Sequence, residues 1–213
     1  MTSPVVIAVD GPAASGKGTL ARRIAAELGY AYLDTGLLYR AIGLSLVKAG
    51  VDPSDMDAAA KAAQAFDAGA ADFSDPALRD EKTGQAAGIV AANPSVREAL
   101  VKVQRHFAAN PPGGAAGAVL DGRDIGTVIC PDADYKFFID ADIEERARRR
   151  VKELQDRGDP SIPARVLQDI KERDERDRTR AVAPLATAAD ASVVDTTNLN
   201  ADAAFALAMS FIR

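Results

Sequence analysis

A glycine-rich stretch at residues 11–19 (GPAASGKGT) most constrains what this chain can fold into, because of the segments on either side of it. Residues 5–9 are continuously apolar and rich in β-branched side chains, as in a parallel strand that is covered on both faces. From Leu20 to Leu28 apolar residues recur at helical spacing, and Gly29 ends the run. A glycine-rich turn between a buried strand and a helix directs successive backbone N–H groups into one concavity, where they bind phosphate.

The stretch follows the phosphate-binding pattern G-x-x-x-x-G-K-[ST] of P-loop proteins except at its last position. Gly18 stands where the pattern has a hydroxyl residue, and the hydroxyl comes one residue later, at Thr19. In most P-loop proteins the hydroxyl after the lysine ligates Mg²⁺, whereas the order Gly-Lys-Gly-Thr resembles the nucleoside monophosphate kinases. The alternative is an ordinary glycine-rich turn with a surface lysine, which the flanking strand and helix disfavour. We therefore expect a nucleoside triphosphate to bind here, with Lys17 adding a mobile positive charge.

Size and composition limit the classes of protein to consider. The chain has 213 residues, of which 47% are hydrophobic, enough for one α/β core with small insertions. A formal net charge of −5 argues against a general nucleic-acid binder, which needs a basic surface. No apolar run approaches the ~20 residues that span a bilayer, so we expect a cytoplasmic protein without a membrane partner.

The single cysteine and the single histidine are weak candidates for chemistry. Cys130 excludes an internal disulfide and a cysteine-based metal site, and we interpret it as a small apolar filler. His106 lies on an expected helix, off its apolar face, which favours a solvated residue over a catalytic one.

The pattern of apolar segments predicts an α/β fold with a parallel sheet. Five short apolar runs read as strands, and the segments between them read as helices. The strands are expected at residues 5–9, 31–34, 118–120, 135–139 and 192–194. Helices are expected at residues 20–28, 37–48, 53–66, 93–110, 144–157 and 163–180 and from about residue 201. Residues 67–80 have little periodicity and are expected to form a surface connection.

Two further segments place charged groups where ligands bind in such a fold. Asp34 or Thr35 can cap the helix at 37–48, and Arg40 in its first turns makes a second anion site, although an ordinary capped helix with a surface arginine explains this segment better when it is taken alone. The apolar run at 118–120 leads into Asp121-Gly122-Arg123-Asp124 (residues 121–124). Ligands bind beyond the carboxyl ends of the strands in an open α/β sheet, so these charges are expected in the site.

Positive charge is concentrated in residues 143–180, which hold twelve of the chain's 26 Lys and Arg residues against ten acidic ones. One interpretation is a solvated helical hairpin with ion pairs four residues apart, such as Glu172 with Arg176, and little apolar surface to bury after Ile170. The other is a mobile flap that brings arginines onto phosphate. Arg173, Asp177 and Arg180 share one face of the second helix.

Four segments together resemble the bacterial cytidylate kinases, which belong to the nucleoside monophosphate kinases. They are residues 11–19, residues 34–40 (DTGLLYR), residues 121–128 (DGRDIGTV) and residues 171–185 (KERDERDRTRAVAPL), in family order across nearly the whole chain. The resemblance implies one three-layer α/β/α P-loop domain over residues 1–213. Its core would comprise residues 1–36, 115–145 and 183–213, with a monophosphate-binding insertion at 37–114 and a helical lid at 146–182.

The resemblance also implies roles for individual residues. ATP would be held by Gly11, Pro12, Ala13, Ala14, Ser15, Gly16, Lys17, Gly18 and Thr19. The acceptor phosphate would be held by Arg40, Arg123 and Arg180, with Thr35 and Tyr39 nearby. Arg97 and Asp124 would recognise the cytosine, and Arg173 and Asp177 would contact the ribose. The catalytic residues would be Lys17, Arg123, Arg173 and Arg180.

The activity implied is transfer of a phosphoryl group from ATP to CMP, and to dCMP, by a monomer whose Mg²⁺ is held mainly by ATP phosphates and water rather than by a protein metal site. Alternatives are a preference for UMP or another monophosphate, and a nucleotide-binding switch without kinase activity. The chain departs from the family at Gly88, where a serine usually helps to hold the base, which predicts weaker discrimination against UMP. Residues 67–80 are also too short and glycine-rich for the small sheet that many relatives have in the insertion.

Overall fold

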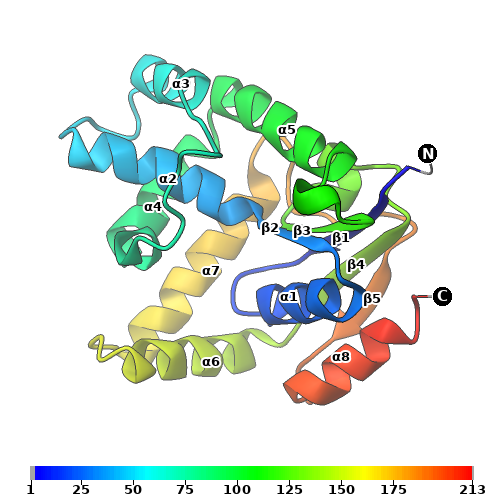
Figure 1. The fold of residues 1–213 in the computed structure, drawn as a ribbon. Helices are drawn as coiled ribbons and strands as arrows, with labels where there is room; N and C mark the ends of the chain where they lie inside the picture. Colours follow the sequence, from blue (N-terminus) through cyan, green and yellow to red (C-terminus); the bar gives the residue numbers. More distant parts are fainter. Residues whose placement is uncertain (1–2, 213) are drawn as a thin grey trace.

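The computed structural model describes residues 3–212 and has one parallel sheet at its centre (Figure 1). The strands are β1 (Val5–Asp10), β2 (Ala31–Asp34), β3 (Gly117–Gly122), β4 (Tyr135–Asp140) and β5 (Ser192–Asp195). Their order in the sheet is β2-β3-β1-β4-β5, so β1 lies in the middle. The predicted five-stranded parallel sheet is therefore confirmed.

Helices cover both faces of the sheet. They are α1 (Lys17–Leu28), α2 (Thr35–Lys48), α3 (Met56–Gln64), α4 (Glu81–Val90), α5 (Pro94–Ala109), α6 (Ile143–Asp156), α7 (Pro163–Thr179) and α8 (Ala201–Met209). The helices α1 and α8 pack on the face that carries Ile7 and Val9. The opposite face, with Ala8 and Leu120, packs against α5 and a short helical turn at Ile125–Ile129. Alternate residues of β1 are thus buried in different layers, which explains its continuous apolar run.

Two groups of helices lie beyond the edge where the strands end (Figure 1). The helices α2, α3, α4 and α5 share an apolar cluster that includes Leu38, Ile42 and Leu100. The hairpin of α6 and α7 has a smaller cluster of its own, built on Ala147, Val166 and Ile170. Between β2 and β3 the described structure contains helices and turns, with no strand in residues 67–80.

The sequence patterns missed α4 altogether. Gly84 and Gly88 interrupt its turns and lower its helix propensity. The structure gives a reason for both glycines, because a Cβ atom at position 84 would lie 2.9 Å from Arg40 Nη2 and one at position 88 would lie 2.9 Å from Arg176 Nη2. The expected surface connection at 67–80 also contains a short 3₁₀ turn at Pro76–Arg79, in which Leu78 is buried.

The α6–α7 hairpin buries more than its apolar residues suggest. The buried face of α7 continues past Ile170 to Asp174, which is paired with Arg146 of α6. Ion pairs four residues apart form in α6, between Glu145 and Arg149, and in α7, between Asp174 and Arg178 at 3.9 Å. The expected pair of Glu172 with Arg176 is not formed among the described residues. As expected, α7 buries no apolar residue after Ile170, but a buried carboxylate, Asp174, continues its buried face.

Four of the five strands end in an aspartate, and β3 ends one residue after Asp121. Carboxylates are therefore concentrated at the ligand-binding edge of the sheet. The parallel register sets Asp34 of β2 beside Asp121 of β3. Asp10 at the end of β1 accepts hydrogen bonds of 2.8 Å from the backbone N–H groups of Ile125 and Gly126. It thereby fixes the turn that follows β3, which carries two of the predicted site residues.

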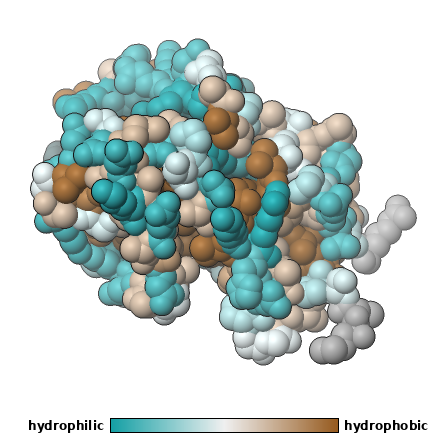
Figure 2. Space-filling model, turned by 90° about the horizontal axis from the view of Figure 1, so that it is seen from above, coloured by the Kyte–Doolittle hydropathy of each residue, from teal (hydrophilic) through white to brown (hydrophobic). Residues whose placement is uncertain are grey.

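Figure 2 shows hydrophilic residues over most of the face seen from above, with hydrophobic residues visible between them. Within residues 3–212, no helix has the length and apolar character that crossing a membrane requires.

Candidate active site

A cavity of about 520 Å³ lies at the carboxyl ends of the strands, between the loop after β1, the start of α2, α4 and the α6–α7 hairpin. Among the described residues that line it, eleven are basic and five are acidic. The chain as a whole has a net charge of −5. Positive charge is therefore gathered at this cavity, as the concentration of arginines in the sequence predicted for part of it.

The cavity brings together most of the predicted site residues, from segments far apart in the sequence. It is lined by Ala13, Ala14, Gly16, Lys17, Gly18 and Thr19 from the loop, and by Thr35, Tyr39, Arg40, Arg97, Arg123, Asp124, Arg173, Asp177 and Arg180. Three residues of the loop do not line it. Gly11 and Pro12 are buried beneath the loop, and Ser15 faces a neighbouring cavity.

The loop approaches the core so closely that only glycine fits at its start. A Cβ atom at position 11 would lie 2.0 Å from the carbonyl oxygen of Ile139. Gly16, with φ 89°, is in the left-handed region and precedes the first residue of α1. Glycine adopts this conformation without the steric cost that a side chain imposes. The loop therefore ends at a helix N-terminus, where backbone N–H groups are free to bind an anion.

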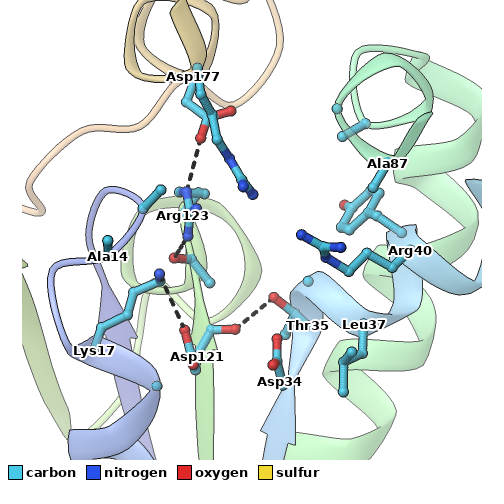
Figure 3. Close-up of a pocket in the computed structure, with 18 of the residues that line it drawn as sticks. Ala14, Lys17, Asp34, Thr35, Leu37, Arg40, Ala87, Asp121, Arg123 and Asp177 are labelled. Carbon is cyan, nitrogen blue, oxygen red and sulfur yellow. Dashed lines mark hydrogen bonds and ion pairs between the residues drawn. The ribbon is translucent and has the colours of Figure 1, made fainter. Parts of the chain in front are cut away.

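Lys17 projects from this helix N-terminus into the cavity (Figure 3). Its Nζ donates to the carbonyl oxygen of Pro12 at 3.3 Å and lies 4.0 Å from Asp121 Oδ1. Burial, helped by the nearby positive charge of Arg123, lowers the pKa of Lys17 to about 8. An anion bound in front of the loop would stabilise the charged form of this lysine.

The position of Asp121 explains why Gly18 replaces the usual hydroxyl residue. A Cβ atom at position 18 would lie 2.9 Å from Asp121 Oδ2, so the carboxylate occupies the space that a side chain there would need. Asp121 is buried, and Tyr32 donates a hydrogen bond of 3.1 Å to the same oxygen. Burial raises the pKa of Asp121, against the opposing charge of Lys17. This carboxylate belongs to a segment that was predicted to lie in the site, but no role was predicted for it individually.

Arg40 faces Lys17 and Arg123 across the cavity (Figure 3). One nitrogen, Nη1, donates to the carbonyl oxygens of Leu78 at 2.7 Å and Asp80 at 3.3 Å. The predicted second anion site at the start of α2 thus has an arginine held by backbone carbonyls. The aspartate at the N-terminus of α2, Asp34, makes no side-chain hydrogen bond to the helix, so the predicted cap by Asp34 is absent.

Thr35 does not supply that cap either, because its hydroxyl is used elsewhere. It donates to the carbonyl oxygen of Asp121 at 2.8 Å and is buried. The bond ties the start of α2 to β3 and holds the second anion site beside the end of the sheet.

Arg123 is held in place by neighbours on both sides. Its Nε donates to Asp177 Oδ2 at 2.9 Å, and its Nη1 donates to the carbonyl oxygen of Gly122 at 3.1 Å. Burial alone would raise the pKa of Asp177, but the charges of Arg123 and Arg173 outweigh it and lower that pKa. Arg173 makes no ion pair among the described residues, and burial next to Arg123 lowers its pKa to about 10. The site therefore holds a surplus of buried positive charge, which favours binding of anions.

Asp124 joins two of the predicted arginines. Arg97 donates to Asp124 Oδ2 in a short, buried ion pair, and Arg180 Nη2 lies 3.4 Å from Asp124 Oδ1. The guanidinium of Arg97 lies over the ring of Tyr39, 5.8 Å from its centroid. Burial raises the pKa of Asp124, although both arginines oppose the shift. A carboxylate between two arginines presents hydrogen-bond acceptors and donors side by side.

The cavity also has walls that the sequence did not identify. They include Arg22, Arg79, Ala87, Ala91, Arg149, Arg150, Glu153 and Arg157. The α6 arginines belong to the basic segment 143–180, and that concentration of positive charge was the sequence feature that could have identified them. Ala87 lies in α4 and Ala91 caps its C-terminus. No sequence pattern predicted this helix, although Gly88 within it is a departure from the family.

A second cavity of about 320 Å³ adjoins the first on the other side of the loop. It is lined by Ser15, Gly16 and Thr19 of the loop, by Glu145, Arg148 and Arg149 of α6, and by Leu20, Thr196, Leu199, Asn200, Ala201 and Ala204. Gly16, Thr19 and Arg149 line both cavities, which are therefore neighbours on the two sides of the loop.

The single histidine is solvated and the single cysteine packs among apolar residues, as the sequence predicted. His106 is exposed on α5 and does not line the cavity. Cys130 is half-buried beside Ile125 and Ile129, and burial raises the pKa of its thiol to about 11. Such a thiol stays protonated and acts as an apolar filler.

Known proteins resemble this chain over nearly its whole length. The family model for cytidylate kinase matches residues 7–213. A cytidylate kinase from Paramagnetospirillum magneticum is 58% identical over 207 residues, covering 97% of each chain. One from Rhodospirillum rubrum is 53% identical over 208 residues, covering 98% of this chain and 97% of the relative.

Similarity to solved structures is more distant and concerns the fold alone. An uncharacterized protein from Eubacterium ventriosum aligns with a TM-score of 0.57 at 14% identity over 98% of each chain. A sugar kinase from Janibacter sp. aligns with a TM-score of 0.52 at 12% identity, over 98% of this chain and 94% of the other. Because the family model and relatives above half identity span nearly all of its length, the chain belongs to the cytidylate kinase family.

Proposed function

We propose that this member of the cytidylate kinase family transfers the γ-phosphoryl group of ATP to CMP, giving ADP and CDP. The observation that carries the proposal is the shared cavity in which Lys17 and Arg123 lie opposite Arg40 (Figure 3). Two anionic nucleotides placed there would meet between cations from separate segments. The same cavity makes a simple nucleotide switch a poor alternative, because a switch needs no second anion site.

ATP would bind with its phosphates in the loop of residues 11–19, against the N-terminus of α1 and Lys17. The second cavity, which the other side of the loop lines, would hold the adenosine part of ATP. Its walls at Leu199 and Ala204 offer apolar surface to an adenine ring, and Arg149 lies beside Gly16 where the triphosphate passes. This arrangement accounts for two neighbouring cavities at one loop.

CMP would bind across the first cavity, with its phosphate between Arg40, Arg123 and Arg180. Asp124 and Arg97 would face the base, and Arg173 and Asp177 the ribose. Cytosine presents an amino donor beside ring acceptors, which a carboxylate paired with an arginine matches. Uracil would set its O4 against the carboxylate of Asp124, and two opposed acceptors would weaken its binding.

The transfer needs no side chain to remove a proton. The attacking oxygen belongs to a phosphate whose second pKa is about 6, so it is already ionised at neutral pH. What the reaction requires is in-line placement of two phosphates and neutralisation of the charge on the transferred group. We assign these tasks to Lys17, Arg123, Arg173 and Arg180.

Mg²⁺ fits the donor chemistry beside the loop. Asp34 and Asp121 lie in register on adjacent strands, and carboxylate oxygens accept hydrogen bonds from the waters that Mg²⁺ retains. We propose that the ion is bound mainly by ATP phosphates and water, with these two carboxylates orienting the waters. When bound, the ion would neutralise charge on the phosphates that the cations of the chain bring together.

The two groups of helices beyond the strand ends would have different functions. We propose that residues 37–114 hold the monophosphate and that residues 146–182 form a lid, with the remaining residues as the core of one domain. The α6–α7 hairpin carries Arg173, Asp177 and Arg180 on its site-facing side, so its closure would exclude water while completing the cation cluster. A monomeric, cytoplasmic enzyme and acceptance of dCMP remain predictions from the sequence.

An initial-rate comparison of CMP, dCMP, UMP and AMP as acceptors with ATP tests the proposal. We expect kcat/KM to be highest for CMP, with dCMP close to it. The kcat/KM for UMP should be lower than that for CMP. The difference should be smaller than in an enzyme with serine at position 88, because Gly88 offers no side chain to the base. A strong preference for AMP would contradict the roles of Arg97 and Asp124, and ATP turnover that ignores every monophosphate would contradict kinase activity.

A further inference from the structure

One buried arginine, Arg146 in the first turn of α6, connects three segments of the molecule. Its Nε donates to the carbonyl oxygen of Ala141 at 2.9 Å, in the residue that directly follows β4. Its Nη1 donates to the carbonyl oxygen of Ala13 at 3.2 Å, in the phosphate-binding loop. Its Nη2 donates to Asp174 Oδ2 at 2.6 Å, in α7. Only 4% of the Arg146 side chain is exposed, and it lines neither cavity.

The contact with Ala13 fixes a peptide group of the loop. Ala14, the next residue, has φ 59°, in the left-handed region that residues with a side chain rarely adopt. The carbonyl of Ala13 and the N–H of Ala14 belong to one planar trans peptide and point in opposite directions. A guanidinium that holds the carbonyl therefore directs the N–H away from itself and maintains a backbone conformation that is otherwise disfavoured.

The contact with Asp174 fixes the position of α7. The Asp174 side chain is 3% exposed, and its Oδ1 has no hydrogen-bond partner among the described residues. Arg178 also approaches Oδ2, at 3.9 Å, but its side chain is half exposed. Arg146 is therefore the main counter-ion of a buried carboxylate. Asp174 directly follows Arg173, which lines the cavity, so the ion pair determines where that turn of α7 lies.

We propose that Arg146 is a positioning residue that couples ATP binding at the loop to the placement of the α7 arginines. It holds the loop peptide with one nitrogen and the helix that carries Arg173 with another. A change in the contact with Ala13 would therefore alter the contact with Asp174, and the reverse. The proposal rests on the proposed function in one respect, that ATP occupies the loop. By thermodynamic reciprocity, ATP would favour the Arg146–Asp174 pair as much as the pair favours ATP.

A purely structural ion pair is the alternative. Such a pair would stabilise the hairpin against unfolding but would not affect the affinity of the loop for nucleotide, because Asp174 touches no cavity. The two explanations therefore differ in whether a substitution in α7 alters binding at a loop on the other side of Arg146.

The test uses the full chain with the substitutions Arg146→Lys and Asp174→Asn, alone and together. The dissociation constant of a β,γ-imido analogue of ATP is measured by calorimetry without any acceptor, and thermal unfolding is measured in parallel. We expect Asp174→Asn to weaken binding about fivefold and Arg146→Lys about tenfold, within the usual range of coupling between sites. The double variant should resemble Arg146→Lys alone, because one link is lost in both.

Arg178→Ala is the matched control, since it removes the exposed cation beside the same carboxylate, and we expect binding within twofold of the parent chain. Unchanged analogue binding in Asp174→Asn with a lower unfolding temperature would overturn the proposal, as would fully additive effects in the double variant. If Asp174→Asn does not fold, Arg146→Lys decides, because unchanged analogue affinity there is also incompatible with the proposal. The measurement needs no CMP, so a failure of the proposed acceptor specificity would leave its outcome interpretable.

Discussion

Two walls of the active-site cavity are built in different ways. On the sheet side, strand ends and the loop of residues 11–19 place Lys17 and Arg123, and the register of adjacent strands fixes Asp34 beside Asp121. On the opposite side, α4 and its C-terminal cap offer only Ala87, Gly88 and Ala91 to the cavity. Arginines from other helices lie against this small-residue face, with Arg40 on Gly84 and Arg176 on Gly88.

The difference teaches how each wall obtains its charges. The sheet wall carries its cations on the segments that form it, so its geometry follows from backbone hydrogen bonding. The α4 wall provides space, and its charges come from side chains that reach across it. We therefore expect substitutions on the sheet wall to affect the chemical step most, and substitutions on the α4 wall to affect acceptor selection.

The largest effect is expected from Arg123→Ala on the sheet wall. This arginine is paired with Asp177 and lines the cavity where we propose that the phosphoryl group is transferred, so its loss should lower kcat by about 10³-fold or more. Steady-state rates at saturating ATP and CMP provide the measurement, with Lys102→Ala on the exposed side of α5 as a control that should keep the parent rate. A kcat within tenfold of the parent would break the assignment of the chemical step to this wall.

Asp124→Asn should sharpen the comparison, because Asp124 ends the sheet wall yet pairs with Arg97 from α5. We expect kcat/KM for CMP to fall about 100-fold, and that for UMP about tenfold, since an amide can donate to the uracil O4. Rates with both acceptors measure the ratio. Equal losses with CMP and UMP would mean that Asp124 supports the site without recognising the base.

The contrast between the walls also explains what the sequence could predict. Apolar strands and motif residues such as Lys17 and Arg123 lie on the sheet wall, where spacing along the chain translates directly into position. The α4 wall was not predicted, because Gly84 and Gly88 weaken the helical pattern. Both glycines pack against arginines that are distant in the sequence. The Arg146–Asp174 pair joins residues 28 positions apart and shows no periodicity. Such features depend on tertiary proximity, which a single sequence does not encode locally.

The pH dependence of ATP binding tests the sheet wall by titration. The pKa of Lys17 is lowered from its usual value to about 8, so the free enzyme loses this charge as pH rises through 8. The charged form binds ATP, and we expect the dissociation constant of ATP to rise up to about tenfold between pH 7 and pH 9. The rate at saturating ATP should change less, because bound phosphates hold the lysine charged. Binding titrations at constant Mg²⁺ measure this, with Lys17→Arg as the control that should flatten the profile. A dissociation constant independent of pH across this range would show that the buried lysine stays charged.

The smallest effect is expected from Gly88→Ser on the α4 wall. A Cβ atom here would lie 2.9 Å from Arg176 Nη2, the far end of a flexible and exposed side chain that can move aside. The added hydroxyl would then face the cavity and the base, and one hydrogen bond of ordinary strength should raise the preference for CMP over UMP by about threefold to fivefold. Gly88→Ala adds the Cβ without the hydroxyl, and Arg176→Ala removes the guanidinium without adding either, so both should leave the ratio of kcat/KM values unchanged. If Gly88→Ser and Gly88→Ala lower both activities alike, the glycine serves only the packing of Arg176 on α4, and the wall has no part in choosing the base.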